Sequence, residues 1–234
     1  MALVAFWIPV FGAMGLFDRI PLGLRIGRSF RRLGRLFCRV YPWRIHISGR
    51  EHLKPNRVYI IVSNHQSLTD IPIISHLKLD TKWLARAELF QVPVVGWMLR
   101  KAGDIPVARS DPHKRAVALL RSAKYLRRRC SVVFFPEGTR SPDGQVQPFW
   151  DGAFRLAIHE QVPILPLVVE GTGAVLPLNS WLFGKNRDIR LRVLEEVPVD
   201  SFTLTQTAEL RDAVRQRIVE ELQRLRQAEP ADRS

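Results

Sequence analysis

The chain of 234 residues is near the upper end of the size of one domain, and folding at that size buries roughly 70% of the surface of the unfolded chain. A composition of 46% hydrophobic and 25% charged residues excludes a wholly disordered chain, a collagen-like fibre and a bundle of many membrane spans. Two cysteines, Cys38 and Cys130, are too few for a disulfide framework or a four-ligand zinc site, which indicates a reducing compartment. The excess of 36 basic over 22 acidic residues, a net charge of +14, favours anionic partners such as nucleic acid, anionic lipid or phosphorylated substrates.

The first 50 residues hold a large share of this positive charge, with nine arginines and a single acidic residue, Asp18. Residues 1–17 before it carry no charge, and as one helix they would extend about 25 Å, which is the lower limit for crossing a bilayer. Pro9 would bend such a helix. The segment has neither the positive start nor the cleavage site of a secretory signal, so we expect it to be retained.

A basic amphipathic helix is predicted from residue 27 to residue 40, after a turn at residues 18–23. Apolar side chains recur there at helical spacing, while five arginines fall mostly on the rest of the helix surface: Arg28, Arg31, Arg32, Arg35 and Arg39. Such a helix suits the headgroup level of an anionic leaflet, where each cation contributes about 1 kcal/mol. We therefore interpret residues 1–43 as a membrane-associating segment. A core helix with a solvated face stays open as an alternative, whereas the many aliphatic residues disfavour a nucleic-acid-binding arm.

Residues 44–228 alternate short β-rich runs with helical patterns, which predicts an α/β domain, and residues 229–234 are expected to fray as a tail. Strands are predicted at 58–62, 105–107, 131–135, 162–169 and 189–194. Helices are predicted up to about Leu77, from Pro112 with Asp111 as N-cap, around 153–159 and over 210–225. The expected fold class is a mixed, largely parallel twisted sheet flanked by helices. The arginines at 127–129 suit the dipole of a helix end, so we interpret them as structural.

The first chemical signal is a polar loop at 64–70, directly after the first buried strand, where α/β folds build their sites. His65 and Asp70 can meet only if His65 lies in the loop and the chain turns back toward Asp70. The carboxylate would then fix the imidazole tautomer and leave the other ring nitrogen free to accept a proton. The plainer alternative is a loop histidine followed by an aspartate that caps the next helix. The chain lacks the sequence signatures of serine hydrolases, nucleotide-binding loops and zinc proteases, and we expect no metal site.

A second polar loop, Phe-Pro-Glu-Gly-Thr-Arg at 135–140, follows another hydrophobic strand. Gly138 allows the backbone to approach a ligand closely, Thr139 offers a hydroxyl, and Arg140 offers a planar fork of donors suited to phosphate. Taken alone, Pro-Glu-Gly is also typical of a turn. Arg109, after the strand at 105–107, is a further candidate for binding phosphate, with a solvated cation at a strand end as the alternative.

Four blocks in order along the chain resemble those of the glycerolipid acyltransferase family, whose best-known members are the 1-acylglycerol-3-phosphate acyltransferases. The blocks are Asn-His-Gln-Ser-Leu-Thr-Asp at 64–70, Gly-Asp-Ile-Pro-Val-Ala-Arg at 103–109, Phe-Pro-Glu-Gly-Thr-Arg-Ser at 135–141 and Val-Pro-Ile-Leu-Pro at 162–166. The stretch at 82–89 is similar to a connecting segment of the family. Each block is modest alone, but the ordered set, which covers roughly residues 58–170, is specific. The chain departs from the family at Trp150, where many relatives have a lysine, and at Ala108, where an acid or polar residue is frequent.

The resemblance implies transfer of a fatty acyl group from a thioester, on coenzyme A or acyl carrier protein, to the free hydroxyl of lysophosphatidate, which gives phosphatidate without a metal or cofactor. It implies that His65 is the general base and that Asp70 orients it. It also implies a set of residues around the phosphate of the acceptor, with Lys82 as an addition: Arg109, Glu137, Gly138, Thr139, Arg140 and Lys82. The expected location is the cytoplasmic face of a membrane, in a bacterium the inner membrane, with membrane lipids and no nucleic acid as partners.

Two other functions stay open at this stage. The same chemistry could act on another lysolipid, either a lysophospholipid or a lyso-ornithine lipid. A non-catalytic basic protein that binds a membrane would explain the charge of the chain, but it would explain none of the four blocks.

Overall fold

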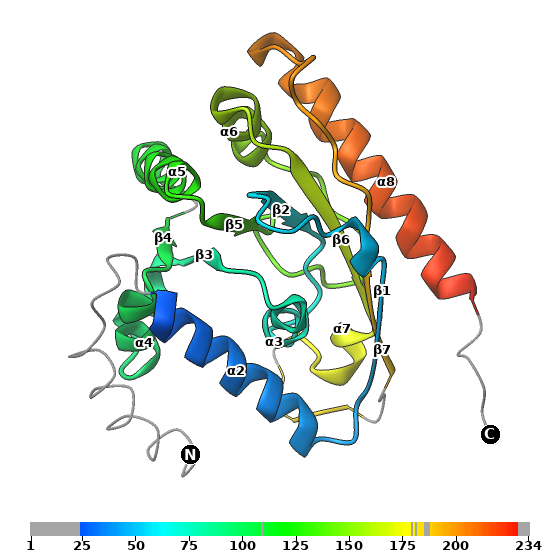
Figure 1. Cartoon of the computed structure of the whole chain (residues 1–234). Coiled ribbons are helices and arrows are strands. Elements are labelled where there is room, and N and C mark those ends of the chain that lie inside the picture. The colour runs from blue at the N-terminus through cyan, green and yellow to red at the C-terminus, as the bar shows by residue number, and fades with distance from the viewer. Residues whose placement is uncertain (1–23, 109, 179, 181, 185–187, 229–234) are drawn as a thin grey trace.

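The computed structural model describes residues 24–108, 110–178, 180, 182–184 and 188–228. They form one seven-stranded sheet in the order β1-β7-β6-β2-β5-β3-β4 (Figure 1). Its strands are β1 (Arg44–Ser48), β2 (Ile60–Ser63), β3 (Thr81–Arg86), β4 (Ile105–Val107), β5 (Ser131–Phe134), β6 (Ile164–Glu170) and β7 (Asp188–Val193). Neighbouring strands are parallel except for β6 and β7, which are antiparallel. The predicted mixed, largely parallel sheet is confirmed.

Helices cover both faces of this sheet (Figure 1). One face carries α5 (Pro112–Arg127), α6 (Gly152–Glu160) and α8 (Thr207–Gln227). The other carries α2 (Leu24–Val40), α3 (Asp70–Ile74) and α7 (Thr172–Val175), and α4 (Val95–Ala102) packs beside α2. Short 3₁₀ turns lie at Arg50–His52, Ser75–Leu77, Ala87–Gln91 and Leu204–Gln206.

The central strand β2 shows why the sheet needs two covered faces. Ile60 and Val62 pack into the core beneath α5, α6 and α8, whereas Ile61 packs into the core beneath α2 and α3. All three side chains are fully buried. A strand that is apolar on both sides reads as a continuous hydrophobic run, and such a run is stable only between two layers of helices.

The predicted strands and helices are present, with ends that differ by a few residues. Asp111 caps α5 as expected, because its carboxylate accepts the amide of Lys114 at 3.1 Å, and Pro112 takes the first helical position. Four of the observed strands and helices were not predicted: β1, β3, α4 and α7. The uncharged run at 1–17, the turn at 18–23, Arg109 and the tail at 229–234 lie outside the described residues, and the proposed domain boundaries stay predictions.

Some arginines of α2 contact the rest of the protein and others are exposed, so the basic face predicted for this helix is only partly free. Arg28 forms a two-pronged ion pair with Asp80, with bonds of 2.7 and 2.5 Å, and Arg35 donates to the carbonyl of Ser75 at 2.9 Å. Arg31 is only 8% exposed. The helix therefore packs on the sheet domain through basic side chains as well as apolar ones.

The exposed part of α2 is smaller and mixed in character: two arginines, Arg32 and Arg39, and two aliphatic residues, Leu36 and Val40. Among the helices in the described ranges, none combines the length and the hydropathy that crossing a bilayer requires.

Candidate active site

Three loops meet at one edge of the sheet, because β5, β2 and β6 are adjacent and parallel and their carboxyl ends point the same way. The loop after β2 contains His65, the loop after β5 contains Glu137 and Arg140, and β6 ends at Glu170. Such an edge is where open α/β sheets place ligands. The two polar loops predicted from the sequence therefore lie side by side.

His65 and Asp70 form the predicted pair. The imidazole Nδ1 lies 2.7 Å from Oδ2 of Asp70, the first residue of α3, so the loop turns back on itself as the pairing requires. A carboxylate acceptor at Nδ1 keeps the proton on that nitrogen. The other ring nitrogen, Nε2, makes no hydrogen bond with any residue that the structure describes. It has the lone pair that a general base needs.

Further hydrogen bonds fix the Asp70 carboxylate in the orientation in which it accepts from His65. Its Oδ2 also accepts the backbone amides of Gln66 at 2.8 Å and Ser67 at 3.0 Å, and its side chain is completely buried. Its Oδ1 has no hydrogen-bond partner within the described part of the chain. A buried carboxylate with so much of its bonding on one oxygen has little freedom to rotate, so the orientation of the imidazole is fixed with it.

The imidazole ring lies flat against an aromatic neighbour. Phe135, the residue after β5, stacks on His65 with ring centroids 4.0 Å apart and an interplanar angle of 16°. Trp83 lies behind Phe135, with ring centroids 6.0 Å apart. The His65 side chain is 10% exposed. The imidazole is therefore largely covered by its neighbours rather than on an open surface.

Glu137 joins the two loops through their main chains. Its Oε1 accepts the amide of His65 at 2.7 Å, and its Oε2 accepts the amide of Gln147 at 2.9 Å. The amide of Ser141 donates to the carbonyl of His65 at 2.8 Å. The pKa of Glu137 is raised to about 7, mainly by burial and also by the nearby negative charge of Asp70. The two amide donors lower this pKa, but their effect is smaller. Both carboxylate oxygens are thus occupied by the protein itself.

The rest of the second loop is open to a ligand. Gly138 has φ +73° and its amide donates to the carbonyl of Phe135 at 3.0 Å, so a tight turn fixes this backbone. Thr139 is exposed, and Arg140 is half-buried without a hydrogen bond or ion pair to any described residue. Of the residues predicted to bind phosphate, Gly138, Thr139 and Arg140 lie on the accessible side of this loop.

Lys82 does not join this cluster. It lies in β3, fully buried, and its Nζ donates to the carbonyl of Ala102 and lies 5.4 Å from the centroid of the Tyr125 ring. Ala102 is the last residue of α4 and Tyr125 lies in α5, and neither belongs to the loops that contain His65 and Glu137. Lys82 is therefore part of the buried contacts between β3, α4 and α5.

Asn64 has a structural role that the sequence analysis missed. Its side-chain amide pairs with the main chain of Val169 in both directions, with both distances 2.8 Å, and so continues the ladder between β2 and β6 by one rung. These two hydrogen bonds fix the backbone where β2 ends, one residue before His65. An asparagine immediately after a buried strand is the pattern that could have indicated it.

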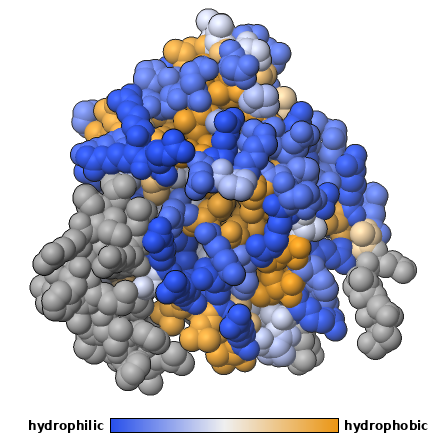
Figure 2. Space-filling model, in the orientation of Figure 1, coloured by the Kyte–Doolittle hydropathy of each residue, from blue (hydrophilic) through white to orange (hydrophobic). Residues whose placement is uncertain are grey.

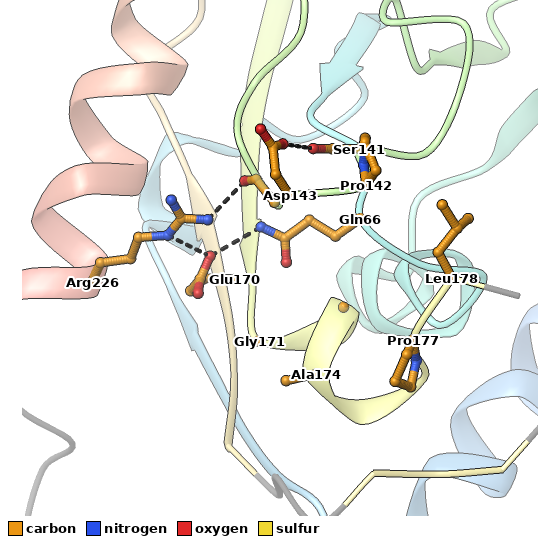
Figure 3. Close-up of a pocket in the computed structure, with 12 residues that line it drawn as sticks. Gln66, Ser141, Pro142, Asp143, Glu170, Gly171, Ala174, Pro177, Leu178 and Arg226 are labelled. Carbon is orange, nitrogen blue, oxygen red and sulfur yellow. Dashed lines mark hydrogen bonds and ion pairs between the residues drawn. The ribbon is translucent and has the colours of Figure 1, made fainter. Parts of the chain in front are cut away.

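A cavity of about 280 Å³ opens beside the same loops, between Gln66, the 141–144 segment, the end of β6 and α7 (Figure 3). In Figure 3 Gln66 and Arg226 converge on Glu170, at 3.0 and 3.3 Å, and Arg226 also donates to the carbonyl of Gly144 at 2.7 Å. These contacts tie the C-terminal end of α8 to the His65 loop. The side chains around the cavity are largely paired with one another.

The surface around the site is mixed. Figure 2 shows one face of the molecule, with hydrophilic surface over most of it and apolar surface near its centre. Leu68 and Ile71, which lie between His65 and Asp70 and just after Asp70 in the sequence, are 40% and 41% exposed. Within the described ranges, no three His, Cys, Asp or Glu side chains gather closely enough to hold a metal ion.

This geometry agrees with comparisons to known proteins. Residues 44–170 match the family model described as Acyltransferase, which is more than half of the chain. A chloroplastic 1-acyl-sn-glycerol-3-phosphate acyltransferase of Brassica napus is 36% identical over 154 residues, 65% of this chain and 45% of the relative. The corresponding chloroplastic protein of Arabidopsis thaliana is 37% identical over 143 residues, 60% of this chain and 40% of the relative. The matched part of the chain therefore spans less than half the length of these curated relatives.

A solved structure matches nearly the whole chain. It is the 1-acyl-sn-glycerophosphate acyltransferase PlsC of Thermotoga maritima, with a TM-score of 0.80, 27% sequence identity, and coverage of 97% of this chain and 95% of that chain. The fold and the paired loops define an acyltransferase of the α/β class. The chain belongs to the Acyltransferase family.

Proposed function

We propose that the protein transfers a fatty acyl group from a thioester to the free hydroxyl of lysophosphatidate and so forms phosphatidate. The observation that carries the proposal is the buried pair of His65 and Asp70, 2.7 Å apart, at the sheet edge that also presents Arg140. The names of the relatives and of the solved neighbour support the choice of acceptor.

The reaction needs one proton to move twice. As the acceptor hydroxyl oxygen attacks the thioester carbonyl carbon, Nε2 of His65 takes the hydroxyl proton, which accelerates such reactions by roughly 10² to 10⁴-fold. The carbon–sulfur bond then breaks, and the departing sulfur takes the proton back from the imidazolium. Asp70 stabilises the imidazolium between these steps because its carboxylate lies against Nδ1. No resident metal or cofactor is required, since a thiolate is a good leaving group.

The acceptor is oriented by its phosphate. We place the phosphate at the turn formed by Gly138, Thr139 and Arg140, and Arg109 belongs to the same proposal through its position after β4. A guanidinium binds phosphate through two parallel hydrogen bonds, which fixes direction as well as distance. Holding the hydroxyl against Nε2 in this way turns binding energy into orientation. The exposed Leu68 and Ile71 beside the pair offer an apolar surface for the acyl chains.

The proposed location is a membrane surface, on the cytoplasmic face and in a bacterium at the inner membrane. Both the acceptor and the product are lipids, and the exposed side of α2 combines Arg32 and Arg39 with Leu36 and Val40. This mixture suits the boundary between headgroups and acyl chains. The proposed donor is an acyl thioester of coenzyme A or of acyl carrier protein.

The test is an assay of purified protein with a labelled acyl thioester and a panel of lysolipids. We expect phosphatidate from lysophosphatidate, and we expect His65→Ala to lower kcat by at least about 10²-fold while the protein still binds vesicles. If labelled product forms only from a lysophospholipid or only from a lyso-ornithine lipid, that lipid is the acceptor and lysophosphatidate is not. Undiminished transfer by His65→Ala would remove His65 from the mechanism.

A further inference from the structure

Glu137 is the second buried carboxylate of the site, and its surroundings differ from those of a ligand for phosphate. The residue is 5% exposed, and each of its oxygens already accepts a backbone amide. A carboxylate also repels a phosphate dianion. We infer that Glu137 is a positioning residue, which in its ionised form holds the main chain of His65 in the place from which the imidazole reaches the acceptor. This inference rests on the proposed function.

The contacts of His65 divide into two sets. Asp70 fixes the ring, with 2.7 Å between Nδ1 and Oδ2, whereas the loop after β5 fixes the main chain. The amide of His65 donates to Glu137 at 2.7 Å, and its carbonyl accepts the amide of Ser141 at 2.8 Å. The imidazole can be directed correctly only when both sets are present, because Asp70 controls rotation of the ring but not the position of the backbone that carries it.

The second oxygen of Glu137 extends this support to the far end of its own loop. Oε2 accepts the amide of Gln147 at 2.9 Å, and Arg215 of α8 holds the same segment by donating to the carbonyls of Gln147 and Val146 at 3.0 and 2.6 Å. The 137–147 loop is therefore closed on itself by one carboxylate and supported from α8. The backbone of Arg140, which lies inside this loop, is therefore held in place relative to His65.

Two backbone amides donate to Glu137, and the ionised carboxylate offers a strong acceptor oxygen to each of them. Glutamine replaces one of these oxygens by an NH₂ donor, and protonation converts one of them into a hydroxyl group, which is a much weaker acceptor. One buried backbone N–H would then have its hydrogen bond lost or weakened. Protonation of Glu137 and the substitution Glu137→Gln should therefore have the same effect on the loop.

The charged groups that face Glu137 determine when it ionises. Asp70 opposes ionisation by its negative charge, and Arg215 favours it from α8. His65 faces it from the β2 loop through the backbone amide. Burial outweighs the favourable contacts and brings the pKa of Glu137 to about 7. The contact between Glu137 and the amide of His65 can thus change near neutral pH.

The experiment compares kcat and the acceptor KM of the wild type and Glu137→Gln from about pH 5.5 to about pH 8.5. At high pH we expect kcat of the variant to be about 10- to 100-fold lower, with the acceptor KM within about twofold. At low pH the two curves should converge to within about threefold, because protonated Glu137 then resembles the glutamine. Glu160→Gln is the matched control: Glu160 ends α6, its carboxylate accepts from Arg127 at 2.7 Å, and it lies outside the loops that contain His65 and Glu137. Its kcat should follow the wild type at every pH.

A ratio of wild-type to Glu137→Gln kcat that does not change with pH would overturn the inference, and so would a raised acceptor KM with unchanged kcat. Should the variant fail to fold, the wild type alone gives the answer by NMR. The amide protons of His65 and Gln147 should shift with the same midpoint as the side-chain carboxyl carbon of Glu137, and unrelated midpoints contradict the contact. A wild type that acylates no lysolipid refutes the proposed function, while the NMR comparison still tests Glu137.

Discussion

Asp70 concentrates three hydrogen bonds on one oxygen, from His65, Gln66 and Ser67. Asp70→Asn can keep an oxygen near these donors, but it loses the charge that stabilises the imidazolium. If its NH₂ group turned toward Nδ1, the imidazole would take the wrong tautomer. We expect kcat to fall by about 10² to 10⁴-fold, with little change in the acceptor KM.

The double variant of Asp70→Asn with His65→Ala checks this reasoning. Because Asp70 acts through the imidazole, the double variant should be about as active as His65→Ala alone. Losses that multiply would show that the two side chains act independently.

Arg140 supplies the prediction for acceptor binding. It is half-buried on the accessible side of its loop, and a bidentate bond to phosphate contributes about 1.5–3 kcal/mol. Arg140→Gln should therefore raise the acceptor KM by roughly 10- to 100-fold and leave the thioester KM nearly unchanged. Arg140→Lys should recover only part of the loss, because an ammonium lacks the planar fork. An equal rise in both KM values would speak against a phosphate contact.

The pairing of His65 with Asp70 could be predicted from the sequence, because a five-residue spacing at the end of a buried strand leaves one geometry in which the two meet. The role of Glu137 could not. Its motif indicates a turn and a ligand-binding loop, whereas the structure directs its carboxylate inward to two amides from residues 65 and 147. Pairings between side chain and backbone across 72 positions leave no periodic trace in a sequence.

At the scale of elements, the sequence showed five strands and missed β1 and β3. β1 is an edge strand with alternating charged and apolar residues, Arg-Ile-His-Ile-Ser, and it is half-exposed along its length. β3 contains Lys82, a residue that β-propensity disfavours, buried by contacts that only the fold supplies. Both strands therefore form because of contacts with distant parts of the chain, which the local sequence pattern does not reveal.

The contacts of α2 determine how membrane binding should be tested. Deleting residues 1–43 removes the partners of Asp80 and of the Ser75 carbonyl, so it would expose part of the core as well as remove the proposed membrane-associating segment. Charge reversal on the exposed side is cleaner. Arg32→Glu with Arg39→Glu should weaken binding to anionic vesicles by at least about 10-fold, since each cation near such a surface contributes about 1 kcal/mol.

Arg121→Glu with Arg128→Glu is the matched control for that pair, because both arginines are exposed on the opposite side of the sheet domain, in α5 and just after it. Vesicle flotation at low and high salt measures the effect. Equal losses in the two double variants would mean that net charge, and not the face of α2, governs binding.

At the scale of the whole molecule, two buried carboxyl groups contribute a decrease of stability with rising pH, against a smaller set of opposing groups that includes His76, whose pKa burial lowers. Burial raises the pKa of Asp104 from 3.8 to about 6 and that of Glu137 from 4.5 to about 7. The folded state therefore holds protons that the unfolded state has released between these values. The stability that these groups contribute is fully present at low pH and is lost as pH rises through about 6 to 7.

Thermal unfolding should show this as a decrease in Tm between pH 5 and pH 8. Asp104→Asn should reduce the decrease, because an amide has no charge to bury. Ion-paired carboxylates such as Asp80, whose pKa Arg28 lowers, act in the opposite sense but below about pH 4. A Tm that rises between pH 5 and pH 8 would contradict the assignment. Activity and stability therefore favour opposite states of Glu137, a conflict common at functional sites.

The pairing of β1 with β7 sets the order in which the molecule can be completed. β1 finds its parallel neighbour only when a strand about 140 residues later has been synthesised, which at ribosomal rates takes roughly 7 to 30 s. During that interval α2 and β1 are already outside the ribosome without the sheet edge that β1 joins. Under the proposed membrane location, a nascent chain of this kind can reach a lipid surface before its sheet is complete, which would separate membrane delivery from the completion of the fold in time.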